Sequence, residues 1–389
     1  MEYACIETKC IHLSDMEEEQ KERDGIYGAV SFPIFQSATF SHKGIGITTG
    51  YDYSRQANPT RHYLERTIAS LEQGVDAVAF STGMAAISAV MELFQPGDHI
   101  ITESDLYGGS LRLFNTIGKK NGLEFTHLCM EEDDPRRYVK KNTKAVYIET
   151  PTNPMMHVVD LKRVGEFCRK NNIIFIVDNT FLTPYLQNPL TFGADIVIHS
   201  GTKYISGHND VLAGFAVTAS EELGEKLHRI CTTTGASLAP FDAWLVQRGV
   251  KTLAVRVERA SHNTARIADW LGTVPDVEKV FYPGDPESKG YEIMKNQARG
   301  FGAMISFNMK SEEQARRVLQ NVKLIQFAES LGGVETLITY PLTQTHAEVP
   351  EEIRKKTGLT GKLLRLSVGI ENSEDLIRDL EQAFIKSRR

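Results

Sequence analysis

Short apolar runs of strand length alternate with helical patterns between residues 60 and 220. The apolar runs are residues 76–80, 97–102, 144–149, 172–178, 194–200 and 213–219. Two of the stretches between them, residues 84–94 and 160–171, repeat apolar residues with helical spacing. Strands that are apolar throughout are buried on both faces, and their alternation with helices is typical of a parallel sheet. The pattern therefore predicts an α/β domain with a mostly parallel sheet, whose ligands bind beyond the carboxyl ends of the strands.

The two ends of the chain follow other patterns. Residues 1–55 show little periodicity, and the stretch SFPIFQSATF within them is typical of an extended segment rather than a domain. Residues 252–272 form a long helical pattern that leads into a smaller α+β unit, which ends in a helix over residues 373–389. These patterns predict three parts, which are residues 1–55, 56–250 and 251–389.

The composition of the 389 residues excludes several classes of protein. The 44 basic and 50 acidic residues give a net charge of −6, and this lack of a basic excess argues against a nucleic-acid partner. No run of about 18 apolar residues occurs, and the first residues lack the basic and apolar parts of a signal peptide. The five cysteines form no C-x-x-C pair, which favours reduced thiols. We therefore expect a cytoplasmic protein without a membrane span.

The apolar run over residues 194–200 is followed by a lysine, in the sequence HSGTK. A partly buried ammonium group is costly, so a lysine at this place indicates a need for its amine. Lys203 could form a Schiff base with a carbonyl, while the hydroxyl groups of Ser200 and Thr202 could donate hydrogen bonds to phosphate oxygens. A surface lysine is the alternative that applies to almost any single lysine.

Three other strand ends carry residues of suitable chemistry. Gly83 and Met84 stand where a strand meets a helix, and the free N–H groups of a helix start attract phosphate, although an ordinary tight turn gives the same pattern. Asp178 ends a fully apolar strand, where a carboxylate needs a cationic partner or serves as a helix cap. Tyr107 offers a flat ring for stacking or for core packing, and Arg112 adds a charge nearby.

Pyridoxal phosphate (PLP) is the cofactor that needs all four features: an amine for its aldehyde, a carboxylate for its pyridine nitrogen, a phosphate cradle and a ring face. A zinc enzyme is disfavoured because His199, His208 and His346 are far apart in the sequence and no H-E-x-x-H motif occurs, so we expect no metal. A nicotinamide enzyme is disfavoured because the nearest match to G-x-G-x-x-G, over residues 44–50, follows no apolar strand.

A series of motifs in one order gives the chain a resemblance to a known family. The motifs are GAVSFPIFQSATF, YDYSRQANPTR, FSTGMAA, DLYGGSLR, ETPTNP, VDNTF, HSGTKYISGHND, ESLGGVETLITYP and LLRLSVGIEN. They span nearly the whole chain and resemble the Cys/Met-metabolism family of PLP-dependent enzymes, the transsulfuration group of the fold-type I (aspartate aminotransferase-like) superfamily. Two departures, RQANPT for the more common RSGNPT and Gly201 in HSGTK, remove none of the expected ligands.

The resemblance implies a role for each candidate at the cofactor. Lys203 would bind the cofactor aldehyde, Asp178 would pair with the pyridine nitrogen and Tyr107 would stack on the ring. Asn153 would contact the side of the phenolic oxygen. The residues expected to hold the phosphate group are Gly83, Met84, Ser200 and Thr202.

The resemblance also implies a second subunit. Tyr53 and Arg55 would complete the phosphate site of the neighbouring subunit, so the N-terminal segment would contact that subunit and the catalytic unit would be a homodimer, paired into a homotetramer. Residues 56–250 would form the PLP-binding domain. The C-terminal domain would contribute Arg365 and Ser330, which bind the substrate α-carboxylate, because a guanidinium binds a carboxylate with two hydrogen bonds.

The resemblance further implies chemistry on small sulfur amino acids. Lys203 would move protons, and Tyr107 or Tyr53 would assist the departure of the leaving group. Arg112 and Glu335 match positions that lie around the distal end of the substrate in cystathionine γ-synthases and γ-lyases. Gly109 stands where methionine γ-lyases usually carry a cysteine, which disfavours methionine as the substrate.

The favoured reaction is γ-replacement on an O-acylhomoserine with cysteine or sulfide, which gives cystathionine or homocysteine. Residues 327–354 favour it because they resemble bacterial cystathionine γ-synthases that also act as sulfhydrylases. A cystathionine β-lyase or γ-lyase is the close alternative, and a methionine γ-lyase or an aminotransferase is less favoured. A catalytically silent PLP-binding protein would be expected to have lost Arg365, Tyr107 or Tyr53, and all three are present.

Overall fold

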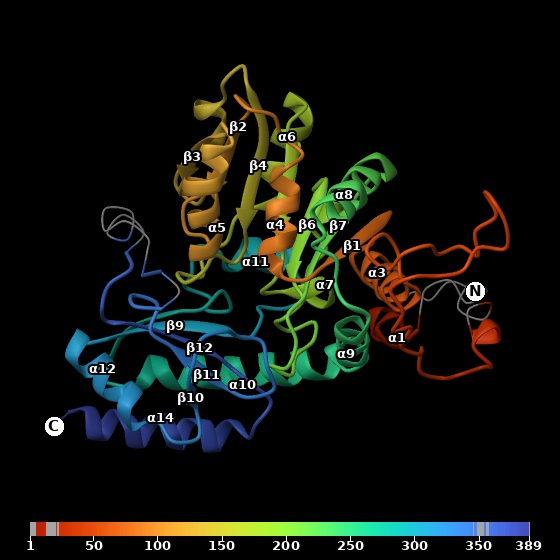
Figure 1. Cartoon of the computed structure of the whole chain (residues 1–389). Coiled ribbons are helices and arrows are strands. Elements are labelled where there is room, and N and C mark those ends of the chain that lie inside the picture. The colour runs from red at the N-terminus through yellow and green to blue at the C-terminus, as the bar shows by residue number, and fades with distance from the viewer. Residues whose placement is uncertain are drawn as a thin grey trace.

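Two sheets organise the chain. The computed structural model describes residues 5–12, 21, 23–344, 346–347, 354 and 358–388. A seven-stranded sheet occupies the upper half of Figure 1, and a five-stranded sheet lies below it. The long helix α10 (Leu253–Thr273) runs along the lower half, next to the smaller sheet.

The larger sheet is mostly parallel, which confirms the predicted fold class. Its strand order is β1-β7-β6-β5-β4-β2-β3, in which β7 is antiparallel to both of its neighbours and the other pairs are parallel. The strands are β1 (Asp76–Phe80), β2 (His99–Glu103), β3 (Glu124–Leu128), β4 (Thr143–Glu149), β5 (Ile174–Asp178), β6 (Ile196–Ser200) and β7 (Gly214–Thr218). The sequence pattern missed β3, because this edge strand is only partly buried and has no continuous apolar run.

Helices cover both faces of this sheet. Alternate residues of β6 contribute to different hydrophobic clusters, Val197 to one and Ile196 and Ile198 to the other, so each face has its own core. Polar caps fix where helices begin: Asn58 accepts hydrogen bonds from the first turn of α3, and Asp160 does the same for α6. None of the helices in the described part of the chain is long and apolar enough to cross a membrane.

The helical segments of this part of the chain have the following bounds. They are α1 (Ile6–Ile11), α3 (Pro59–Glu72), α4 (Gly83–Met91), α5 (Gly108–Leu113), η1 (Phe114–Gly118), η2 (Pro135–Tyr138), α6 (Leu161–Asn171), α7 (Thr183–Leu186), η3 (Pro189–Phe192), α8 (Glu221–Thr234) and α9 (Pro240–Val250).

The smaller unit packs helices against the five-stranded sheet. The sheet has the order β10-β11-β12-β9-β8, and its core, which includes Phe307 and Phe384, is separate from the two cores of the larger sheet. The elements that follow α10 are β8 (Val277–Phe281), α11 (Tyr291–Gln297), β9 (Met304–Met309), α12 (Glu312–Asn321), β10 (Gln326–Phe327), β11 (Leu337–Thr339), β12 (Leu363–Ser367) and α14 (Ser373–Ser387). Of these, α11 contributes Met294 to a core of the larger sheet. The domain boundaries at residues 55 and 250 stay a prediction.

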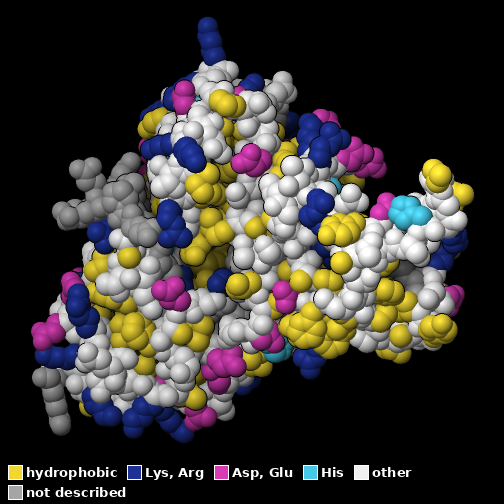
Figure 2. Space-filling model, viewed as in Figure 1, with side chains coloured by type: hydrophobic (Ala, Val, Ile, Leu, Met, Phe, Trp, Pro, Cys, Tyr) yellow, Lys and Arg dark blue, Asp and Glu magenta, His cyan; other side chains and the backbone are white. Residues whose placement is uncertain are grey.

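The N-terminal segment contributes little regular structure. After α1, the described residues up to Asn58 form a helical stretch at residues 23–25, turns and two isolated bridges, Thr39 with Tyr53 and Gly44 with Ile47. Tyr27 and Ile45 are fully exposed, at 103% and 105%. Figure 2 shows hydrophobic side chains gathered on the side of the molecule where Figure 1 places α9 and this segment. A contact of this segment with a neighbouring subunit stays a prediction.

Candidate functional site

A cavity of about 330 Å³ lies beyond the carboxyl ends of β4, β5 and β6, where the two sheets face each other. Its position matches the rule that parallel sheets bind ligands at the carboxyl ends of their strands. Ten of the residues expected at the cofactor or substrate line this cavity. They are Gly83, Met84, Tyr107, Asn153, Asp178, Ser200, Thr202, Lys203, Ser330 and Arg365.

Lys203 follows β6 in a series of turns and points its amine across the cavity. Its Nζ donates a hydrogen bond to Ser330 Oγ at 2.6 Å, which joins the larger unit to the smaller one. Burial, together with the positive charge of Arg365, lowers the pKa of Lys203 to about 8. Ser330 itself has a φ of 93°, a left-handed conformation that costs a non-glycine residue free energy and is concentrated at functional sites. About one tenth of the Lys203 side chains is therefore present as the nucleophilic free amine at pH 7, far more than for an ordinary lysine.

Asp178 ends β5 and lies against the cavity. Its carboxylate accepts hydrogen bonds from Thr180 N at 3.1 Å, Thr180 Oγ1 at 2.5 Å and Tyr147 Oη at 3.4 Å. Burial raises the pKa of Asp178, while the two hydrogen bonds from Thr180 oppose this rise. Thr180 also accepts a hydrogen bond from Ser200 N at 2.9 Å, so it fixes the ends of β5 and β6 relative to each other. Sequence reasoning missed Thr180, because a threonine in a turn carries no signal of its own.

Glu149 is a second carboxylate on the same wall. It ends β4 and is paired in register with Asp178. Its Oε2 accepts a hydrogen bond from Tyr107 N at 2.9 Å, which holds the backbone of the expected stacking residue. Burial raises the pKa of Glu149 well above its usual value, and the charge of Asp178 adds to the rise. A carboxylate that ends an apolar strand is the same signal that singled out Asp178, so the sequence contained the means to find Glu149.

The expected phosphate side lies at the start of α4. Thr82 caps this helix by accepting a hydrogen bond from Ala85 N, and the N–H groups of Gly83 and Met84 have no partner within the helix. A Cβ on Gly83 would come within 2.9 Å of Ser200 Cβ, so only glycine allows this close approach. Ser200 and Thr202, which both carry a hydroxyl group, complete this side of the cavity.

Of these two, Thr202 is already engaged with the backbone. Its Oγ1 accepts a hydrogen bond from Ala213 N at 3.0 Å and lies 3.3 Å from Ala213 O. A contact of Thr202 with phosphate stays a prediction. Gly201, the departure noted in the sequence, has a local reason: a Cβ there would collide with the ring of Phe215 and lie 3.0 Å from Ala213 Cβ.

Arg365 forms the opposite wall from β12 and is fully buried. Its Nη1 donates to Asn153 Oδ1 at 2.7 Å, and its Nη2 donates to Ser330 O at 3.1 Å and Thr339 Oγ1 at 3.3 Å. The buried Nε has no hydrogen-bond partner. Because Arg365 occupies the oxygen of the Asn153 amide, the amide nitrogen is the group that Asn153 can offer to a ligand.

Four expected residues lie outside this cavity. Tyr53 and Arg55 line a separate pocket of about 280 Å³, where Arg55 Nη1 donates to Thr232 O at 2.7 Å. Glu335 lines an adjoining cavity of about 620 Å³, which shares Ser330 with the first cavity. Arg112 is exposed on α5. The roles of these four at a neighbouring subunit or at the distal end of a substrate stay predictions.

A family model and several known proteins are similar to this chain over nearly its whole length. The family model described as "Cys/Met metabolism PLP-dependent enzyme" matches residues 7–385. A cystathionine gamma-lyase of Bacillus subtilis (strain 168) is 49% identical over 358 residues, which are 92% of this chain and 94% of that protein. A cystathionine beta-lyase of Lactococcus lactis subsp. cremoris (strain MG1363) is 46% identical over 382 residues, 98% of this chain and 99% of that protein.

The fold of this chain is also similar to that of a solved structure. The cystathionine gamma synthase from Xanthomonas oryzae pv. oryzae, solved in complex with aminoacrylate and cysteine, is 40% identical, covers 99% of both chains and has a TM-score of 0.94. The three relatives carry the names of three different activities on cystathionine, so their names leave the reaction of this chain open.

The residues around the cavity fit PLP. The free amine of Lys203 suits its aldehyde, the buried carboxylate of Asp178 suits its ring nitrogen, and the start of α4 suits its phosphate. The unpartnered Nε of Arg365 suits an anionic group next to the cofactor. Among the described residues, no group of His, Cys, Asp and Glu side chains is placed to hold a metal ion.

Proposed function

Because the chain belongs to the family of Cys/Met-metabolism PLP-dependent enzymes, we propose that it catalyses γ-replacement on an O-acylhomoserine. Cysteine or sulfide would be the incoming nucleophile, and cystathionine or homocysteine the product. The observation that supports this proposal is an adjoining cavity, which Glu335 lines and which shares Ser330 with the cofactor cavity. A carboxylate in such an adjoining cavity suits the distal ammonium group of a long zwitterionic amino acid.

Asp178, Arg365 and Lys203 have three different roles in the reaction of the amino acid. Bound PLP supplies an electron sink for the pair left at Cα when the α-proton departs. Asp178 keeps the proton on the ring nitrogen, which makes that sink effective. Arg365 binds the α-carboxylate with its free Nε side and fixes the orientation of Cα. The amine of Lys203, with its pKa of about 8, takes the α-proton and returns it.

Replacement at the γ-carbon needs further proton transfers. A proton must leave Cβ before the bond to the γ-substituent breaks, and the departing group must be protonated or stabilised. Tyr107 lines the cavity, is 39% exposed and has its backbone held by Glu149, so its hydroxyl is the candidate for the second step. Lys203 is the candidate base for the first.

Cleavage of cystathionine is the second candidate function. The names of the Bacillus and Lactococcus relatives favour it, because these proteins are called cystathionine gamma-lyase and beta-lyase at 49% and 46% identity. Cleavage uses the same residues for binding and for proton transfer at Cα. In γ-replacement a second amino acid or sulfide enters the site after the γ-substituent has left, whereas a γ-lyase or β-lyase breaks the C–S bond at Cγ or Cβ and takes up no second nucleophile.

Product analysis by mass spectrometry separates the candidates. The purified protein would be incubated with O-acetylhomoserine or O-succinylhomoserine plus cysteine or sulfide, and separately with cystathionine alone. We expect cystathionine or homocysteine from the homoserine esters at a higher kcat/KM than any product from cystathionine. Efficient release of 2-oxobutyrate or pyruvate from cystathionine, with no product from the esters, would establish the lyase instead.

Glu335 gives the same experiment a matched variant. In Glu335→Gln the side chain keeps its size and its hydrogen bond with Asn209 Nδ2 but loses its charge. We expect about a tenfold rise in KM for cysteine, the cost of one charge-assisted hydrogen bond, with little change when sulfide is the nucleophile. An equal effect on both nucleophiles would place Glu335 outside the substrate site.

A further inference from the structure

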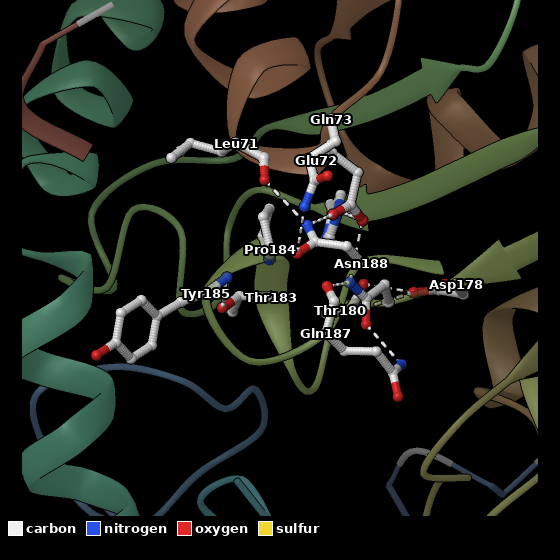
Figure 3. A network of polar contacts seen from close by, with 12 residues as sticks. Leu71, Glu72, Gln73, Asp178, Thr180, Thr183, Pro184, Tyr185, Gln187 and Asn188 are labelled. Atoms are coloured by element: carbon white, nitrogen blue, oxygen red, sulfur yellow. Dashed lines mark hydrogen bonds and ion pairs between the residues drawn. The ribbon is translucent and has the colours of Figure 1, made fainter. Parts of the chain in front are cut away.

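A buried polar network lies behind the cavity, at the end of α3. Glu72, the last residue of this helix, is 0% exposed. Its Oε1 accepts hydrogen bonds from Asn179 Nδ2 and His199 Nε2, both at 3.0 Å, and its Oε2 accepts one from Asn188 Nδ2 at 2.8 Å. Figure 3 shows part of this network, which runs from Glu72 and Asn188 to Thr180 and Asp178. One carboxylate therefore binds three separate segments of the chain.

Two of these partners alternate with the residues that line the cavity. Asp178 and Thr180 line the cavity, and Asn179 stands between them. Ile198 and Ser200 line it as well, and His199 stands between those two. His199 lies within β6, where successive side chains point to opposite faces, and Asn179 directly follows β5. Glu72 therefore binds the ends of β5 and β6 from the side opposite to Ile198 and Ser200.

The network leaves Asn179 and Asn188 no freedom to rearrange. Asn179 Oδ1 accepts from Gln187 Nε2 at 3.0 Å, so both ends of this amide are bound. Asn188 Oδ1 accepts from Arg299 Nη2 at 2.9 Å and from Gln73 Nε2 at 3.3 Å. Each amide therefore has to direct its nitrogen towards Glu72, and the carboxylate is the acceptor that satisfies both. The guanidinium group of Arg299 interacts electrostatically with the Glu72 carboxylate.

We propose that Glu72 is a positioning residue for the cofactor. By binding Asn179 and His199 it sets the places of Asp178, Thr180 and Ser200, which lie on the cavity side of the same strand ends. His199 then acts through its hydrogen bond with Glu72 rather than as an isolated core histidine. The inference rests on the cofactor site described above and is independent of the choice between synthase and lyase.

Holoenzyme variants at His199 test this proposal. In His199→Gln an amide nitrogen replaces Nε2 and keeps a donor for Glu72, whereas His199→Leu keeps the apolar bulk and removes the donor. The first measurement is the rate at which PLP leaves the holoenzyme on dilution, without substrate. The second is the circular dichroism of the visible cofactor band, which reports the orientation of the ring. Both readouts are independent of which product the enzyme forms.

We expect His199→Leu to release PLP about tenfold faster and to change the circular dichroism of the cofactor band, because a buried acceptor without its donor pulls the strand ends out of place. His199→Gln should release PLP within about threefold of the wild-type rate, since its amide nitrogen still donates a hydrogen bond to the Glu72 carboxylate. Equal release rates for the two variants would overturn the proposal.

Glu72→Gln provides an independent variant should His199→Leu fail to fold. Its amide nitrogen would face Asn188 Nδ2, donor against donor, while its oxygen can still accept from His199. We expect faster PLP release here too, and a wild-type rate would contradict the proposal.

Asp379→Asn is the control for lost stability. Asp379 is also a buried carboxylate, but it accepts hydrogen bonds from Lys323 N, Leu324 N and Ile325 N in the smaller unit. We expect this variant to melt at a lower temperature and to release PLP at the wild-type rate. If Asp379→Asn releases PLP as fast as His199→Leu at an equal loss of stability, the role of Glu72 is only structural.

Discussion

The two walls of the cavity differ in charge. The wall from the larger sheet presents two carboxylates, Asp178 at the end of β5 and Glu149 beside it at the end of β4. The wall from the smaller sheet presents the guanidinium group of Arg365 on β12. Lys203 belongs to the first wall but donates its hydrogen bond to Ser330 on the second. The cavity is thus a junction between an acidic and a basic surface.

Burial affects the two walls in opposite directions. It raises the pKa of Asp178 and Glu149, and it lowers the pKa of Arg365 to about 10. An acidic wall suits a protonated ring nitrogen, and a basic wall suits the carboxylate of an amino acid. The difference explains how one cavity could orient a cofactor and a substrate at the same time. It also predicts that changes on the two walls have different kinetic signatures.

The largest expected effect comes from a change of Lys203, which connects the two walls of the cavity. Lys203→Ala removes the amine that would bind the cofactor and move the α-proton, so we expect turnover to fall on the order of 10³-fold or more, together with loss of the visible cofactor absorbance. Lys226→Ala, at an exposed lysine that pairs with Glu222 on α8, is the control and should behave as wild type. Full turnover by Lys203→Ala would remove this residue from the mechanism.

A smaller effect is expected on the acidic wall. Asp178→Asn keeps the shape of the cavity and the hydrogen bonds with Thr180 but removes the charge that would pair with the ring nitrogen. We expect kcat to fall about 10²-fold while KM changes little, because the charge acts in the transition state. Steady-state kinetics would check this, with Asp178→Glu as the variant that retains the charge. A change confined to KM would contradict the assignment.

On the basic wall, which carries Arg365, we expect a change in KM rather than in kcat. Arg365→Ala removes the group that would bind the substrate carboxylate and also frees Asn153 and Ser330. Truncating one partner of a buried, hydrogen-bonded charge pair costs about 2–5 kcal/mol, so we expect KM to rise about 10²-fold or more. Arg365→Lys, which keeps the charge without the fork of donors, should fall between wild type and alanine. Unchanged KM in both variants would place the carboxylate site elsewhere.

The smallest expected effect is the pH dependence of PLP attachment to the apoenzyme. The pKa of Lys203 is lowered to about 8, so the apoenzyme should lose the reactive amine as the pH falls below this value. We expect the rate of PLP attachment to rise up to about pH 8 and then to level off, whereas an ordinary lysine would continue to gain reactivity up to about pH 10. Stopped-flow absorbance would measure it. A rate that still rises above about pH 9 would show that the cavity does not lower the pKa.

The apolar pattern predicts the larger sheet better than it predicts its edge. Strands buried on both faces, such as residues 144–149 and 172–178, are apolar throughout and therefore visible in the sequence. The edge strand β3 is partly exposed, mixes polar and apolar residues, and was missed. Part of the segment over residues 327–354, on which the favoured reaction depends, lies outside the described residues.

The residues of the candidate site were also only partly predictable from the sequence pattern. Residues that reach the cavity from strand ends, such as Asp178 and Ser200, follow from the rule for parallel sheets. Arg365 and Ser330 come from the other unit and could be named only through the family resemblance, because spacing along the chain says nothing about which strands of two sheets face each other. The network around Glu72 could not be foreseen either, since it depends on where the end of α3 lies relative to β5 and β6.

The covalent attachment of PLP through Lys203 is the central claim, and one measurement tests it directly. The holoenzyme would be reduced with borohydride, digested, and mapped by mass spectrometry for the peptide that carries the pyridoxyl group. We predict a single modified lysine, Lys203, with one cofactor per chain. A modification spread over exposed lysines, or located at another lysine alone, would contradict the account.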